Sequence, residues 1–166
     1  VVYLSLAPFQ LWRGFRNRNL KRHRLIGRVA LVAGLTSGVF AVLFGFFLSF
    51  GGTLQASASV AFGAWFMTSL LVAYRAVRRR DIPAHRAWMI RAYALAVAAG
   101  TQTFTQGIGG ALFGTGDLST ALSLTAGWVL NAVVAEVVVR RPRRVRRVPA
   151  GMTHAAADGT AARETA

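Results

Sequence analysis

Long apolar stretches alternate with clusters of basic residues, and this alternation limits the folds open to the chain more than any other feature. The clusters hold seven, six and six Lys or Arg residues and lie at 13–28, 75–91 and 140–147. The apolar stretches between them contain only two charged residues, Asp117 and Glu136. A helix needs roughly 20 mainly apolar residues to cross a bilayer, and these stretches are long enough. The pattern therefore predicts an integral membrane protein built from helices.

Composition agrees with a membrane protein and argues against a nucleic-acid partner. Of the 166 residues, 54% are hydrophobic and 15% are charged, and the mean hydropathy is +0.45. Soluble domains of this size are usually less apolar. The net charge of +15 is confined to alternate connectors and does not cover one soluble surface. This is the positive-inside pattern, so we expect the basic clusters to face the cytoplasm and its anionic lipids, with no nucleic acid bound.

The apolar stretches predict an all-α bundle with four full transmembrane helices and a truncated one before them. Residues 1–12 are too few to cross the bilayer, so they are expected to be the end of a span with further residues upstream. The full spans are expected at about 25–50, 57–77, 84–108 and 118–139. With four full spans, all basic clusters lie on one side of the membrane and the C-terminus is cytoplasmic.

The transmembrane domain is predicted to cover 1–141, and residues 142–166 are predicted to form a cytoplasmic tail that is first basic and then disordered. Two glycine-containing segments, Gly51–Ala56 and Gly107–Gly116, are predicted to be loops on the opposite side. The second one is not expected to bind phosphate, because neither a strand before it nor a Lys-Ser/Thr after it is present.

A block of capping and basic residues occurs twice, 62 positions apart. Matching pairs include Asn19 with Asp81, His23 with His85, and Arg24 with Arg86. Each unit would contain two spans, so the two units would have the same orientation and form a parallel two-helix repeat. Asn19 and Asp81 are predicted N-caps, which places both histidines in the first turn of a helix.

Small residues follow each histidine at helical spacing. The residues on the side of His23 are Gly27, Ala30, Gly34, Gly38, Ala41 and Gly45, and those on the side of His85 are Met89, Ala92, Ala96, Ala99, Thr103 and Gly107. Small residues at such spacing allow close helix packing in lipid. We therefore expect both stripes, and both imidazoles, to face the interior of the bundle at its cytoplasmic mouth.

The two His-Arg pairs have three open interpretations. They could anchor the helix ends at the interface, with imidazole donating to a carbonyl and guanidinium to a lipid phosphate. His23 and His85 could instead bind a ligand, including one haem b held by both rings in an electron carrier. In the third interpretation, the helix N-termini with Arg24 and Arg86 bind an anionic lipid or a phosphorylated small molecule.

Polar residues within the spans are further candidates. Asn131 and Glu136 are candidate ligand-binding residues, with an interhelical hydrogen bond and a local ion pair to Arg140 as the structural alternatives. Together with Gln102 and Gln106, Asn131 could belong to a transporter-like subunit. Because the chain has no cysteine, cysteine-based metal sites and thiolate nucleophiles are excluded. No catalytic residue and no metal site is predicted.

Four short segments resemble one family of membrane proteins. They are APFQLW, HRLIGR (His23–Arg28), HRAWMIRAYAL (His85–Leu95) and WVLNAVVAE (Trp128–Glu136). In this order, they resemble the bacterial predicted membrane proteins grouped as domain of unknown function 2306, over about Gln10–Arg140. The resemblance implies a multi-spanning membrane protein with more helix upstream and implies no particular activity. It makes His23, His85, Asn131 and Glu136 family-motif positions without assigned roles.

Overall fold

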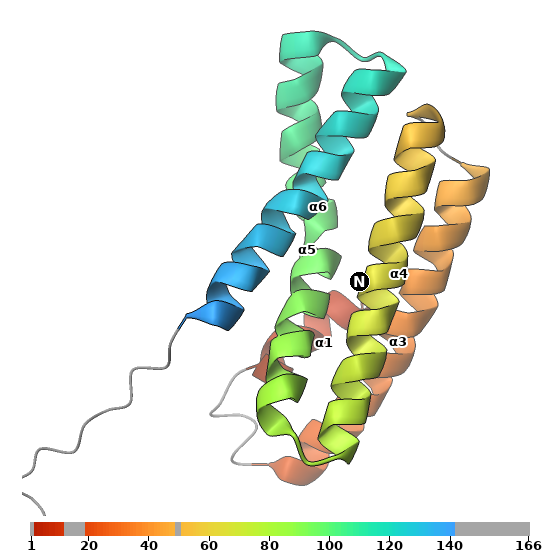
Figure 1. Cartoon of the computed structure of the whole chain (residues 1–166). Helices are drawn as coiled ribbons and strands as arrows, with labels where there is room; N and C mark the ends of the chain where they lie inside the picture. The colour runs from red at the N-terminus through yellow and green to blue at the C-terminus, as the bar shows by residue number, and fades with distance from the viewer. Residues whose placement is uncertain (1, 12–18, 49–50, 142–166) are drawn as a thin grey trace, which may run out of the picture.

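The computed structural model describes residues 2–11, 19–48 and 51–141, and these form helices without any strand (Figure 1). The helices are α1 (Val2–Leu11), α3 (Leu20–Phe47), α4 (Gly52–Arg78), α5 (Ile82–Phe113) and α6 (Asp117–Arg140). The predicted all-α class is therefore confirmed. Residues 13–18 of the first basic cluster and the tail predicted over 142–166 lie outside the described residues.

The long helices form two hairpins, α3–α4 and α5–α6, and α4 is the central helix. It packs against α3, α5 and α6, whereas α1 packs against α3 and touches α5 (Figure 1). The α4–α5 turn, at Arg79–Asp81, lies at one end of the bundle, which we call the basic end. The turns after α3 and after α5 lie at the opposite end.

Three of the described helices, α3, α4 and α6, are long and apolar enough to cross a membrane. Helix α5 is longer still, but threonine and glutamine make its second half more polar. These residues are Thr101, Gln102, Thr103, Thr105 and Gln106. The composition of α3, α4 and α6 thus agrees with membrane-spanning helices, whereas that of α5 is more polar.

Asp81 starts α5 as predicted. Its carboxylate accepts a hydrogen bond from the Ala84 N–H at 3.0 Å, and a proline stands in the first turn. Arg80 takes the left-handed conformation (φ 62°), which allows the Asp81 N–H to close the end of α4 on the Ala76 carbonyl at 2.9 Å. Asn19 stands at the N-cap of α3 as predicted, but its side chain makes no capping bond.

Glycines bring α3 and α4 into close contact. Ala30, Gly34, Gly38 and Gly45 are buried, as the stripe predicted, whereas Ala41 is exposed. A Cβ atom placed on Gly45 would lie 2.7 Å from the Ser59 Cβ atom of α4, and one on Gly38 would collide with Met67. The contact therefore requires hydrogen in place of a side chain at these positions.

The corresponding stripe on α5 does not face a neighbour along its whole length, so this prediction is partly wrong. Ala92 is buried, but Ala99, Thr103 and Gly107 are exposed, and a Cβ on Gly107 would have no atom within 4 Å among the described residues. The reason is that α5 turns a different face to α6. On that face, Gly109 lies directly against Ser123.

The predicted glycine loop at 107–116 is also wrong over most of its length. Helix α5 continues to Phe113, and only residues 114–116 connect it to α6. Glycine lowers helix propensity by about 1 kcal/mol, but a backbone in an apolar environment must satisfy its own hydrogen bonds, which favours continuing the helix. Gly114, with φ 76°, ends it. The connector expected at 51–56 is shorter too, because α4 begins at Gly52.

Gly45 and Gly107 occupy matching positions of the two units, and we expect opposite effects when each is changed to alanine. Gly45→Ala should lower the free energy of unfolding by about 1–3 kcal/mol, because the new methyl group overlaps the rigid Ser59 Cβ. Gly107→Ala should raise it by about 0.5–1 kcal/mol, because the methyl group meets open space and improves helix propensity. Denaturant unfolding in detergent micelles measures both, and equal effects would contradict the packing described.

Candidate functional site

Hydrogen bonds donated by polar side chains tie α6 to α5 along their length. Asn131 donates to the Thr101 hydroxyl at 2.7 Å, and Gln102 donates to the Leu124 carbonyl at 3.0 Å. Near the opposite end, the Ser119 hydroxyl donates to the Gly109 carbonyl at 3.4 Å. Asn131 thus makes the interhelical bond expected as its structural role. Two of the polar residues of α5, Thr101 and Gln102, thus have partners on α6, whereas Thr103 and Thr105 donate to carbonyls of α5 itself.

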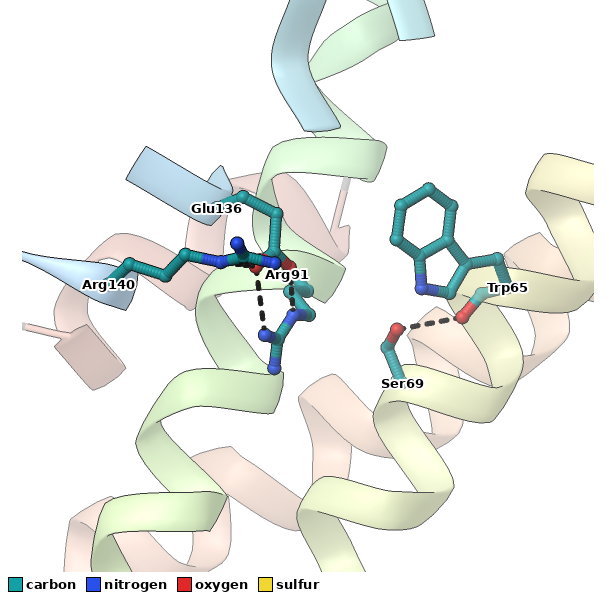
Figure 2. A network of polar contacts seen from close by, with 5 residues as sticks. All are labelled: Trp65, Ser69, Arg91, Glu136 and Arg140. Atoms are coloured by element: carbon teal, nitrogen blue, oxygen red, sulfur yellow. Dashed lines mark hydrogen bonds and ion pairs between the residues drawn. The ribbon is translucent and has the colours of Figure 1, made fainter. Parts of the chain in front are cut away.

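An ion-pair network lies nearer the basic end of the same two helices (Figure 2). Arg91 of α5 donates to both carboxylate oxygens of Glu136, from Nε at 2.5 Å and from the second guanidinium nitrogen at 3.2 Å. Arg140 donates from Nε to one oxygen of the same carboxylate at 3.1 Å. The side chains of Arg91 and Glu136 are 19% and 29% exposed, whereas that of Arg140 is 80% exposed.

Arg91 was the functional candidate that sequence reasoning missed. The spacing of four residues predicts the pair between Glu136 and Arg140. Arg91, in contrast, is 45 residues away from Glu136 in sequence and belongs to the basic cluster at 75–91, so spacing gives no indication of this second pair. Its guanidinium also lies 4.7 Å from the ring centre of Trp88, so a cation-π contact fixes it further. A usable signal was its position, since it lies nine residues inside a helix that starts at Ile82.

A cleft of about 660 Å³ opens beside this network, between α4 and α6. Its lining residues are Trp65 from α4 and Ala132, Val133, Glu136, Val137, Arg140 and Arg141 from the end of α6. Phe62 of α4 and Trp128 of α6 stack with ring centres 5.1 Å apart, and beyond this contact α6 diverges from α4 (Figure 1). Figure 2 shows the Trp65 ring across from the ion pairs. The cleft combines apolar walls with two arginines at the end of α6.

The two histidines lie elsewhere and do not line this cleft. His85 is half-buried, and its Nδ1 lies 2.8 Å from the Ala73 carbonyl of α4, to which the protonated nitrogen donates. His23 is half-buried in the first turn of α3, and its backbone N–H donates to the Asn19 carbonyl at 2.9 Å. Arg24 and Arg86 are exposed. The carbonyl bond of His85 is the one expected of an interfacial anchor.

The space between α3, α4 and α5 is occupied by a hydrophobic cluster that α1 completes. Its buried members are Tyr3, Ala30, Phe66, Leu70, Ala92 and Leu95. Tyr3 packs edge-on against Phe66 with ring centres 5.4 Å apart. A flat cofactor between the helices that carry His23 and His85 would have to avoid this cluster. Haem binding by the two histidines stays a prediction.

The polar residues proposed for transport divide between two places. Gln102 and Asn131 bond α5 to α6, as described above. Gln106 instead lines a separate cavity of about 110 Å³ at the opposite end, together with Ser119 and Ser123. The transporter hypothesis stays a prediction, and a continuous path through all three residues is not among the cavities described.

Comparison with known families agrees with the resemblance seen in the sequence. The family described as Predicted membrane protein (DUF2306) matches residues 1–139. The chain belongs to this family. The match includes both histidines, Arg91 and Glu136, and it agrees with the apolar helices in describing a membrane protein. No curated protein and no solved structure matches the chain.

Arg91 and Arg140 should contribute unequally to stability, although both contact Glu136. Arg91→Ala should lower the free energy of unfolding by about 2 kcal/mol or more, because it removes the bidentate partner of a half-buried carboxylate. Arg140→Ala should cost less than about 1 kcal/mol, because its side chain is exposed and makes one bond. Unfolding of both variants in the same detergent tests this, and a larger loss for Arg140→Ala would contradict the assignment.

Proposed function

We propose that this protein spans the membrane four times and binds an anionic lipid in the cleft between α4 and α6, on the cytoplasmic side. The observation that supports this is the lining of the cleft, in which the apolar side chains of Trp65, Val133 and Val137 are followed by Arg140 and Arg141. An acyl chain matches the apolar walls, and a phosphate matches guanidinium groups. The ligand is therefore expected to be an amphiphile with an anionic phosphate headgroup.

The four-span arrangement is supported by the surroundings of α5. This helix packs against α4 and α6, both of which are apolar enough to cross a membrane. Its polar side chains at Arg91, Thr101 and Gln102 bond to α6, which reduces their cost inside lipid. A parallel repeat of two-helix units is supported by Gly52 and Gly114, which lie 62 positions apart and both have positive φ (67° and 76°).

The orientation follows from charge in this proposal. Arginines cluster at the α4–α5 turn and at the end of α6, and the positive-inside rule assigns these positions to the cytoplasm. The cleft then opens into the leaflet that carries anionic lipid. His23, His85, Arg24 and Arg86 serve in this proposal as anchors at the same interface, consistent with the bond from His85 to the Ala73 carbonyl.

Quenching of Trp65 by lipid with brominated acyl chains tests the proposed site. Purified protein in nanodiscs should lose fluorescence when brominated phosphatidylglycerol is included, and Trp65→Phe should remove part of that loss. Val133→Phe, which fills the cleft, should reduce the quenching of Trp65. Leu130→Phe is the matched control, because Leu130 lies on the same helix, is exposed and does not line the cleft.

The proposal predicts that the quenching of Trp65 saturates with the fraction of phosphatidylglycerol and is weaker with phosphatidylcholine. Quenching that is the same for both headgroups and unaffected by Val133→Phe would show contact with bulk lipid only. That outcome would contradict a specific site.

A haem-b electron carrier is the second candidate, because the Nδ1–H of His85 is fixed by a backbone carbonyl, as is common for histidines that bind metals. Haem would supply one-electron transfer, and His23 and His85 would be its two axial ligands. The observation that weighs against it is the cluster of Tyr3, Phe66 and Leu70 between the helices. A Soret band in the purified protein that is lost in both His23→Ala and His85→Ala would support haem, and a colourless protein without extractable haem would contradict it.

A further inference from the structure

The two arginines that share Glu136 are held in different ways. Arg91 makes two bonds to the carboxylate, stacks on Trp88 and has 19% of its side chain exposed. Arg140 makes one bond at 3.1 Å and has 80% of its side chain exposed. Arg140 and Glu136 line the cleft, whereas Arg91 does not. Arg140 is therefore the partner that can leave at the smaller cost.

The charges in the network leave positive charge in excess. One carboxylate, Glu136, faces Arg91 and Arg140, and Arg141 adds a further positive charge to the same cleft. Arg91 alone neutralises Glu136 through a bidentate contact. Arg140 is thus not needed to compensate the acid once another anion is available.

We propose that Arg140 exchanges partners when the cleft is occupied, and this rests on the proposed lipid-binding function. In the structure, Arg140 bonds to Glu136. When an anionic lipid binds, the guanidinium of Arg140 leaves Glu136 and bonds to the lipid phosphate, while Arg91 keeps Glu136 paired. Glu136 therefore acts as a competitor that the phosphate must displace, and it favours lipids with a net negative charge over zwitterionic ones, whose own cation competes with Arg140 for the phosphate.

The exchange predicts how three variants change lipid binding, and simple charge attraction predicts only some of these changes. Arg140→Gln should weaken phosphatidylglycerol binding about fivefold, as expected for one arginine near an anionic headgroup. Glu136→Gln should strengthen it by about twofold to fivefold, because Arg140 no longer has to leave a charged partner. The double variant should bind like Arg140→Gln alone, since the effect of Glu136 acts through Arg140.

The measurement is a titration of nanodiscs with increasing phosphatidylglycerol in phosphatidylcholine, using the Trp65 quenching described above as readout. Arg141→Gln is the matched control, because this neighbouring arginine lines the same cleft but makes no bond to Glu136 among the described contacts. Arg141→Gln should weaken binding, and adding Glu136→Gln to it should still strengthen binding. The effect of Glu136→Gln on lipid binding should therefore disappear when Arg140 is replaced and persist when Arg141 is replaced.

The outcomes separate the exchange from the function on which it rests. Saturable binding by the wild type with additive effects of Glu136→Gln and Arg140→Gln would overturn the exchange and leave the lipid site intact. Absence of saturable binding by the wild type would overturn the proposed function itself.

A direct measurement on the unmodified side chains covers the case in which Glu136→Gln does not fold. In wild-type protein with ¹⁵N-labelled arginine, solid-state NMR should show dipolar coupling between lipid ³¹P and guanidinium nitrogen in phosphatidylglycerol. Comparison with Arg140→Gln and Arg91→Lys assigns the coupled side chain. Coupling that survives Arg140→Gln unchanged would overturn the exchange.

Discussion

Apolar helices in a membrane gain nothing from hiding apolar side chains from one another, because lipid is equally apolar, and α3, α4 and α6 are apolar enough for this constraint to apply to them. The α3–α4 hairpin relies on glycine, with Gly38 against Met67 and Gly45 against Ser59. The α5–α6 hairpin also has glycine contacts, with Gly109 against Ser123, and it adds polar bonds between Asn131 and Thr101 and between Glu136 and Arg91. One pair is held by close approach and dispersion, and the other adds hydrogen bonds that lipid cannot replace.

The cleft follows from this difference. Helix α6 is bonded to α5 from Ser119 to Glu136, so its course is set by α5. It meets α4 near the opposite end, where Gly51 lies against Ala121, and at the stack of Phe62 on Trp128. Beyond that stack, α6 continues with α5 and leaves α4, and Trp65 becomes one wall of an open space. The site therefore lies where α6 separates from α4.

Sequence periodicity and charge predicted the helical class, the α4–α5 turn at Asp81 and the packed face of α3, because these depend on local chemistry. The exposed face of α5 could not be predicted from the same pattern. Gly45 and Gly107 match in sequence, but α4 covers the first and no described residue covers the second. Matching residues 62 positions apart share a local sequence pattern, whereas burial depends on which helix lies beside each of them. The position of Arg91 inside a helix signals a charge that needs a partner, but the partner, Glu136, lies on another helix and cannot be identified from local spacing.

Beyond its first turn, α6 (Asp117–Arg140) has one acidic residue, Glu136. The surroundings of Glu136 show why a charge is tolerated there. An isolated carboxylate at this position would cost a few kcal/mol or more in lipid. Arg91 offsets that cost through two bonds and is itself stabilised by Trp88, so acid and base compensate one another. Without Glu136, the half-buried guanidinium of Arg91 would lack the two carboxylate bonds it makes here. Each of the two charges therefore makes the other tolerable beside the cleft. The pair is not expected to stabilise the fold more than apolar side chains in the same positions would, because a buried ion pair seldom does so.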